Sequence, residues 1–200
     1  LVNQILGEGE VSIVKTGEVP ARCQESVLAG VWRTLYLDDD DRVICDLLEV
    51  AHMPHLLSKE GEGGEPIDLT IPDAVDGIAN AMPILFELHS HAEAFERDGG
   101  GHAINLSLLP LSVAEVEFID QRLGRGPVDI LSRAYGKCQV ISTQTPNIWW
   151  VRYYNAMDTL VLNTLEVSDI PEVVCAAPED LRDSAERLND ILAPYWSDVA

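Results

Sequence analysis

The sequence predicts an α+β fold made of two tandem copies of one unit, a helix, a four-stranded antiparallel meander and a second helix. Three observations predict it: a long internal repeat, short β-branched segments divided by turn residues, and helix caps beside them. Residues 1–54 align with residues 118–171 at a constant offset of 117, and 13 of the 54 pairs are identical. Unrelated sequences would share about 3. A period of this length indicates two domain-sized copies, not a solenoid of short repeats.

The second copy contains every expected element. A strand is expected at 103–109, and Ser112 then begins a helix with Glu115 completing a capping box. Gly124 follows the apolar stripe of this helix and is expected to end it as a left-handed cap. The first copy begins at Leu1–Leu6, which corresponds to the end of the same helix. We therefore expect the chain to be a fragment.

Each copy then continues with four short segments rich in β-branched and aromatic residues, the pattern of an antiparallel meander. The predicted strands are Val11–Lys15, Arg22–Val27, Val31–Leu37 and Arg42–Val50 in the first copy, and Val128–Ser132, Cys138–Thr143, Ile148–Tyr154 and Thr159–Val167 in the second.

A helix is expected after each meander. In the second copy it begins near Pro178, with Leu181, Ala185, Leu188 and Leu192 as its buried stripe. In the first copy a helical stretch from about Pro72 to Phe95 is expected to kink or divide at Pro83. The segment Arg97–Gly101 is predicted to be the linker, so the domains are 1–97 and 102–200.

Composition narrows the classes of partner. The net charge is −21, from 34 acidic and 13 basic residues, so nucleic acid and anionic membranes are not expected as partners. The charge fits either a positively charged partner or simple solubility. No apolar run approaches the roughly 18 residues of a membrane span. Four widely spaced cysteines without a CxxC pair suggest reduced thiols in the cytoplasm.

The sequence predicts neither a catalytic site, nor a metal site, nor a cofactor. The Gly-x-Gly at Gly7 and Gly124 follows a helix, whereas a phosphate-binding loop lies between a strand and a helix. His89 and His91 are two residues apart on an expected helix, so they point to different faces. Cys23 and Cys138 are expected at buried apolar positions, and the alternative is an iron–sulfur cluster bridged between domains or chains.

Aromatic residues are most concentrated in the segment PNIWWVRYYNAMD at residues 146–158. Alternate residues of a strand point to opposite faces, and the face with Trp149 is shared with the first copy, so it is expected to be core. The other face is either buried under a flanking helix or is a partner surface. The second interpretation follows from its composition, since aromatic residues beside an arginine are typical of binding hot spots. The candidate partner-binding residues are Trp150, Arg152, Tyr154 and Asn147.

The segment Leu109–Leu188, with its WWVRYYN and LNTLEV stretches, resembles the C-terminal conserved region of the HupH/HyaF hydrogenase expression/formation proteins. GEGEVSIV (Gly7–Val14) and QESVLAGVWR (Gln24–Arg33) are similar to the upstream half of that family. The resemblance implies an accessory protein for nickel–iron hydrogenases, acting on the iron–sulfur small subunit in the cytoplasm before export. It implies no catalytic residues.

The sequence therefore predicts a non-catalytic chaperone that binds the hydrogenase small subunit before assembly or export. Other hydrogenase accessory proteins are a second class of expected partner. Its acidic surface would screen a basic stretch of the client, such as a twin-arginine export signal. The alternative is an iron–sulfur cluster carrier or a thiol-dependent enzyme in hydrogenase maturation.

Overall fold

The computed structural model describes residues 4, 6–58, 64–72, 77–134 and 136–196. Contacts within the chain group it into two compact units, here called the first and the second unit. The first unit combines Leu1–Ser58 with Glu172–Ala200, and the second is Lys59–Pro171. This grouping differs from the predicted ranges 1–97 and 102–200, which remain a prediction about the domains. No helix in the described part of the chain is long and apolar enough to span a bilayer.

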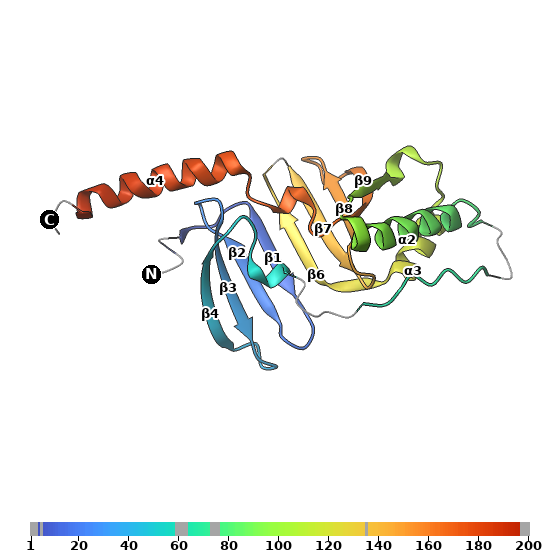
Figure 1. Cartoon of the computed structure of the whole chain (residues 1–200), viewed down its shortest axis with the longest axis horizontal. Coiled ribbons are helices and arrows are strands. Elements are labelled where there is room, and N and C mark those ends of the chain that lie inside the picture. The colour runs from blue at the N-terminus through green and yellow to red at the C-terminus, as the bar shows by residue number, and fades with distance from the viewer. Residues whose placement is uncertain (1–3, 5, 59–63, 73–76, 135, 197–200) are drawn as a thin grey trace. The chain divides into compact units, whose positions relative to one another are not determined.

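The first unit contains an antiparallel meander in the order β4-β3-β2-β1, two short 3-10 turns and a long helix (Figure 1). Alternate residues of β1 to β3 are buried, as the β-branched pattern predicts, whereas nearly all of β4 is exposed. The elements are β1 (Val11–Lys15), β2 (Ala21–Glu25), β3 (Val31–Leu37), β4 (Val43–Val50), η1 (His55–Leu57), η3 (Glu172–Val174) and α4 (Pro178–Trp196).

Helix α4 begins at Pro178, as predicted, with Glu179 in its first turn. Leu181 contacts the backbone at Gly30, where an added Cβ would lie 2.2 Å from its side chain. The predicted buried stripe is wrong further along, because Leu188 is 40% exposed. Leu181 near the beginning of the helix therefore packs on the first unit, whereas Leu188 and Ile191 are exposed.

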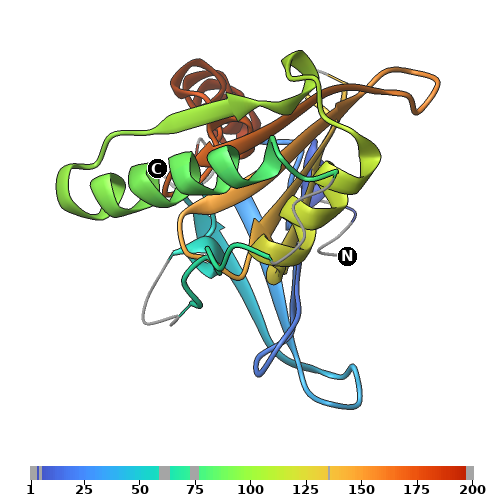
Figure 2. The same cartoon turned by 90° about the vertical axis from the view of Figure 1, so that its right-hand side faces the viewer.

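The second unit contains a five-stranded antiparallel sheet in the order β6-β7-β8-β9-β5, with α2 and α3 on one face (Figures 1 and 2). The core lies between these helices and the sheet, and includes Leu85, Leu88, Ile119 and Leu165. The elements are α2 (Ala81–Asp98), β5 (His102–Asn105), η2 (Leu106–Leu108), α3 (Val113–Leu123), β6 (Arg125–Ser132), β7 (Lys137–Thr143), β8 (Ile148–Tyr154) and β9 (Leu160–Val167).

Both helices of the second unit have clear ends. The predicted capping box of α3 is present at Ser112 and Glu115, and Gly124 follows with a φ of 61°. Helix α2 begins at Ala81, so Pro83 lies in the first turn, where no backbone N–H is needed, and it neither kinks nor divides the helix. The expected helical residues 73–76 lie outside the described part. Gly99 ends α2 in the left-handed conformation, and the chain turns back into β5.

The meanders recur at the spacing of the sequence repeat. Strands β3 and β8, Val31–Leu37 and Ile148–Tyr154, have the same length and lie 117 residues apart, and each carries a β-bulge in its pairing with the next strand. The positive φ angles also recur at this offset, in the pairs Gly7 and Gly124, Gly30 and Asn147, and Asp41 and Asp158. All eight predicted meander strands are confirmed, with ends shifted by up to three residues.

The predicted pair of helix–meander–helix units is nevertheless wrong, although the fold is α+β. In the second unit β5 adds a fifth strand beside β9. Helices α2 and α3 both belong to this unit, whereas α4, predicted to close the second copy, groups with the first. The helix predicted at Leu1–Leu6 lies mostly outside the described residues. The meanders repeat, whereas the helices group with them differently from the prediction.

Candidate functional site

Trp150, the first predicted partner-binding residue, lies in the core of the second unit. It is 3% exposed and belongs to the apolar cluster beneath α2 and α3. Its indole N–H donates a hydrogen bond to the side-chain oxygen of Asn163 on β9. The sequence leaves open whether this face of β8 is buried under a helix or is a partner surface. Trp150 is buried under the helices.

Arg152 and Tyr154 lie on the same face of β8, further toward its end, and both are half-buried. The guanidinium of Arg152 lies over the Trp150 ring, 4.5 Å from its centroid, and 4.0 Å from a carboxylate oxygen of Asp120. The ammonium of Lys137 lies 5.3 Å from the centre of the Tyr154 ring. These side chains form a polar and aromatic border where the helices no longer cover the sheet.

Asn147 is separate from this border. It precedes β8 in the turn from β7, with a φ of 63°, and its carbonyl accepts a hydrogen bond from the Ser168 N–H at 2.9 Å. A strand rises about 3.3 Å per residue, so Asn147 and Tyr154 are roughly 20 Å apart along β8. The four residues do not converge on one site, and their role in partner binding remains a prediction.

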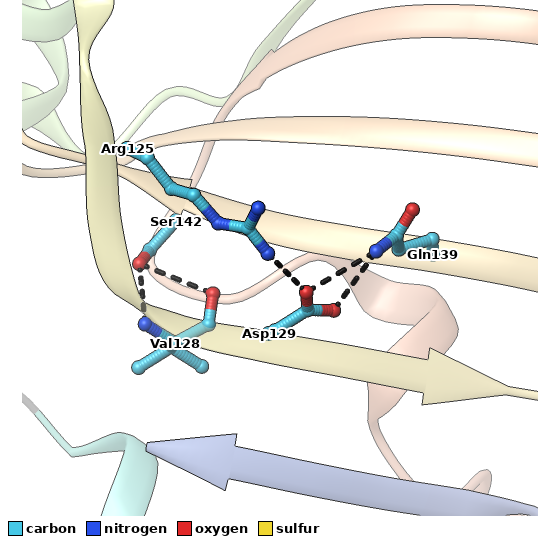
Figure 3. Close-up of polar contacts among 5 residues, drawn as sticks. All are labelled: Arg125, Val128, Asp129, Gln139 and Ser142. Atoms are coloured by element: carbon cyan, nitrogen blue, oxygen red, sulfur yellow. Dashed lines mark hydrogen bonds and ion pairs between the residues drawn. The ribbon is translucent and has the colours of Figure 1, made fainter. Parts of the chain in front are cut away.

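The polar border continues across the neighbouring strands (Figure 3). The Gln139 amide, opposite Arg152 in the sheet, donates to both carboxylate oxygens of Asp129 at 3.1 and 3.2 Å. Arg125 forms an ion pair with the same carboxylate (Figure 3). The Asp129 carboxylate is therefore held between Gln139 and Arg125.

The β6 strand is irregular beside this carboxylate. The Ser142 hydroxyl accepts a hydrogen bond from the Val128 N–H at 2.9 Å and donates to the Val128 carbonyl at 3.3 Å (Figure 3). The register shifts between Arg125 and Asp129, so this side chain replaces ladder bonds that the backbone does not make.

The opposite face of the second sheet holds Cys138, Tyr153 and Glu166 close together. Burial raises the pKa of the Cys138 thiol to about 11 and that of Tyr153 to about 12. Burial also raises the pKa of Glu166, whose carboxylate accepts a hydrogen bond from the Thr164 hydroxyl at 3.0 Å. A nucleophilic cysteine acts as a thiolate, which this environment disfavours.

Cys23 in the first unit is also buried, and burial raises the pKa of its thiol to about 11. Cys45 on β4 is exposed. Iron–sulfur ligation requires several thiolates grouped in space. Within the described part of the chain, no group of three or more possible metal ligands contains a cysteine.

The strand β4 is the most exposed apolar element of the first sheet. It lies at the end of the order β4-β3-β2-β1, so its outer backbone edge has no partner strand among the described residues. Its large apolar side chains are nevertheless exposed, with Ile44 at 63% and Val50 at 83%. An edge strand of this kind is suited to pairing with another extended chain.

The corresponding edge of the second unit is covered. Strand β9 lies 117 residues after β4, and β5 pairs with it antiparallel, with Ala103 opposite Glu166 and Ile104 opposite Leu165. Sequence reasoning identified β4 and β9 as equivalent strands but missed this difference. Its basis is the pairing of β5, a strand that lies before residue 118, where the aligned repeat begins.

One group of possible metal ligands is present among the described residues, namely Glu87, His91 and His102. Sequence reasoning compared His91 with His89 instead. The relevant neighbours of His91 are Glu87, four residues earlier on α2, and His102 on β5.

Residues 1–65 and 78–195 match the family model described as "HupH hydrogenase expression protein, C-terminal conserved region". The chain belongs to this family. The match extends over both meanders and is consistent with the WWVRYYN and LNTLEV stretches that carry the resemblance.

HupH-family relatives match along nearly the whole chain. The "Hydrogenase expression/formation protein HupH" of Rhizobium leguminosarum bv. viciae is 43% identical over 98% of this chain and 70% of its own length. The "Hydrogenase expression/formation protein HoxQ" of Azotobacter vinelandii is 48% identical over 96% and 68%. The "Hydrogenase-1 operon protein HyaF" of Escherichia coli is 34% identical over 95% and 67%.

A solved HupH structure is also similar. It is the "Hydrogenase expression protein HupH" from Thiobacillus denitrificans, with a TM-score of 0.55 and 28% sequence identity. The alignment covers 58% of this chain and 97% of that one. The likeness supports the family assignment through structure as well as sequence.

Proposed function

We propose that this chain is a non-catalytic accessory protein of hydrogenase maturation that binds the small subunit of a nickel–iron hydrogenase before assembly or export. Membership of the HupH family supports a role in hydrogenase maturation, since the relatives are named for hydrogenase expression or formation. The choice of the small subunit as client rests on the resemblance and on the surface described next.

The exposed β4 edge is the observation that carries the proposal. An extended client segment would pair with β4 as β5 pairs with β9, using backbone hydrogen bonds for affinity. The apolar side chains of Ile44, Leu48 and Val50 would cover apolar client residues that become buried after assembly. Backbone pairing needs no reaction pocket, which agrees with a holding role.

Charge gives the second argument. The hairpin before β4 carries the acidic run Asp38–Asp41, within a chain of net charge −21. A basic client segment, such as a twin-arginine export signal, would be attracted to this end of the edge. Such a client is met in the cytoplasm, so we propose that location for the interaction.

The alternative of an iron–sulfur carrier or thiol-dependent enzyme gains no support from the described residues. Cys23 and Cys138 are buried with raised pKa values, and no described group of three ligands includes a thiol. We therefore keep the binding role as the proposed function.

The test is capture of the purified small-subunit precursor by the whole chain and by two variants. Ile44→Glu places a charge on the β4 edge, which has no partner strand among the described residues. Val161→Glu makes the same kind of change 117 residues later, at a position 56% exposed on β9, whose edge is covered by β5. We expect Ile44→Glu to weaken capture at least tenfold and Val161→Glu to leave it within twofold.

Salt dependence tests the charge argument separately. Raising the ionic strength from 0.05 to 0.5 M shortens the screening length from roughly 14 to 4 Å, so capture of a basic segment should weaken. If ionic strength does not change capture of the precursor, the charge argument is contradicted and the β4 edge is not. Equal effects of the two variants would contradict the β4 edge as the contact, and no capture of the precursor would contradict the client.

A further inference from the structure

The junction of α2 and β5 brings together three side chains that the proposed binding role does not use. Glu87 and His91 are four residues apart on α2, so they occupy one face of the helix. Gly99 then ends the helix with a φ of 71°, and the chain returns as β5 alongside α2 (Figure 2). This return places His102, the first residue of β5, beside the two helical residues.

The core fixes the orientation of this group. His102 and Ile104 alternate with Ala103 along β5, so they point to the same side of the strand, and Ile104 belongs to the core beneath α2. Leu88 is fully buried beside Glu87 on the helix. The side chains of the three polar residues therefore meet at the edge of a packed interface and keep partial access to solvent.

The contacts are close and specific. A carboxylate oxygen of Glu87 lies 2.8 Å from Nε2 of His102, and the His91 and His102 rings stack with centroids 3.5 Å apart. One possible ligand atom from each of the three residues lies within 4.8 Å of the other two.

We propose that Glu87, His91 and His102 bind a divalent transition metal ion of the zinc type. Two imidazole nitrogens and one carboxylate oxygen form a ligand set that zinc accepts, and imidazole favours zinc, cobalt and nickel over magnesium or calcium. Three protein ligands leave a coordination position for water or for a group from a partner. The group is partly exposed, so an ion can enter without unfolding of the unit.

Binding requires a small local rearrangement. The two rings are nearly parallel, with an angle of 7° between their planes, and an ion must lie in the plane of each ring that it binds. The rings must therefore splay by rotation of their side chains, and the Glu87–His102 hydrogen bond is replaced by metal–ligand bonds. Glu87 and His102 have room to rotate, because the His102 side chain is 27% exposed and the Glu87 side chain is 48% exposed.

The competing explanation is a structural clip, in which the hydrogen bond and the ring stack simply hold β5 against α2. Helix α2 supplies a matched comparison for it. His89 lies 3.5 Å from a carboxylate oxygen of Glu93, so this pair also joins a histidine and a glutamate at i, i+4, and among the described residues it belongs to no group of three ligands. A metal site requires the third ligand, whereas nonspecific binding to an acidic helix does not.

The experiment measures Zn²⁺ binding to the untagged whole chain under reducing conditions, by titration calorimetry and by metal analysis after dialysis. Co²⁺ is the spectroscopic probe, because its visible absorption reports coordination by protein ligands. We expect about one equivalent of Zn²⁺, at least tenfold weaker binding in His91→Ala and Glu87→Gln, and an unchanged His89→Ala. Glu87→Gln keeps a hydrogen-bonding side chain, and circular dichroism verifies that each variant is folded.

Three results would overturn the proposal in favour of the clip. The first is a chain that does not bind Zn²⁺ stoichiometrically. The second is Zn²⁺ binding that persists in folded Glu87→Gln and His91→Ala, and the third is an equal loss of Zn²⁺ affinity in His89→Ala. Binding of Mg²⁺ as tight as that of Zn²⁺ would also overturn it, since it would indicate only the acidic surface.

Discussion

The indole N–H of Trp32 donates a hydrogen bond to the backbone carbonyl oxygen of Ala51, with 2.9 Å between nitrogen and oxygen. Trp32 is fully buried on β3, and Ala51 is the residue after β4, so the bond fixes the end of the exposed edge strand to the core. The second unit repeats this relationship 117 residues later, where Trp149 donates to the carbonyl of Ser168 at 3.2 Å.

Replacing Trp32 by phenylalanine should therefore destabilise the first unit. The change removes the donor, leaves the Ala51 carbonyl without this partner and shrinks a buried ring, so we expect a loss of about 1–3 kcal/mol in the free energy of unfolding. Urea denaturation followed by circular dichroism measures it. Met157→Ala, at a position 82% exposed, is the control and should change stability by less than about 0.5 kcal/mol. A similar small change in Trp32→Phe would show that this bond does not anchor β4.

The two aromatic residues of β8 should respond differently to truncation. Trp150→Ala removes a side chain from the packed core and should cost about 3–5 kcal/mol of stability. Tyr154→Ala removes a half-buried ring at the border and should cost clearly less. Thermal unfolding of both variants checks this. Equal destabilisation would mean that Tyr154 is as much a part of the core as Trp150.

The strands were predictable from sequence because each meander is stabilised locally. β-branched and aromatic runs separated by turn residues define a strand wherever the chain pairs with its sequence neighbour, and Val31–Leu37 and Ile148–Tyr154 were predicted to the residue. The capping box at Ser112 is likewise a local signal.

The remaining features depend on contacts between distant parts of the chain. Burial of Trp150 depends on helices that precede β8 by dozens of residues, so its strand pattern could not decide between core and surface. The Glu87–His91–His102 group exists because Gly99 turns the chain back along α2. Exposure of Leu188 on α4 could not be inferred either, because an apolar stripe predicts a face suited to burial and does not identify the element that covers it.

The cysteines should differ sharply in reactivity. Cys45 is exposed on β4, whereas Cys23 and Cys138 are buried and burial raises the pKa of both thiols to about 11. Only the thiolate reacts with alkylating reagents, so iodoacetamide at pH 7.5 should modify Cys45 at least tenfold faster than either buried thiol. Mass spectrometry of the peptides, with and without denaturant, measures the rates. Rapid modification of Cys138 in the folded protein would contradict this prediction and support the alternative function as a thiol-dependent enzyme.

The pH dependence of stability should reveal the carboxylate of Glu115. Its oxygens accept hydrogen bonds from the backbone N–H groups of Ser112 at 2.8 Å and Asn80 at 2.9 Å, which lower its pKa in the folded protein. A lowered pKa means that the charged form stabilises the fold above about pH 4.3, the ordinary value in an unfolded chain, and that this contribution is lost as the pH falls through the folded value. Glu115→Gln should therefore be less stable than the parent protein at pH 7, with a difference that narrows toward pH 3.

Glu166→Gln is the matched variant with the opposite sign. Burial raises the pKa of Glu166, so its charged form destabilises the fold as the pH rises above the unfolded value. The amide of glutamine can still accept the hydrogen bond from Thr164, and it carries no charge to bury. The stability of Glu166→Gln relative to the parent should therefore increase from pH 4 to pH 7, while that of Glu115→Gln decreases. Urea denaturation at several pH values measures both, and parallel curves for the two variants would contradict the assignment of one carboxylate to a helix cap and the other to a buried sheet face.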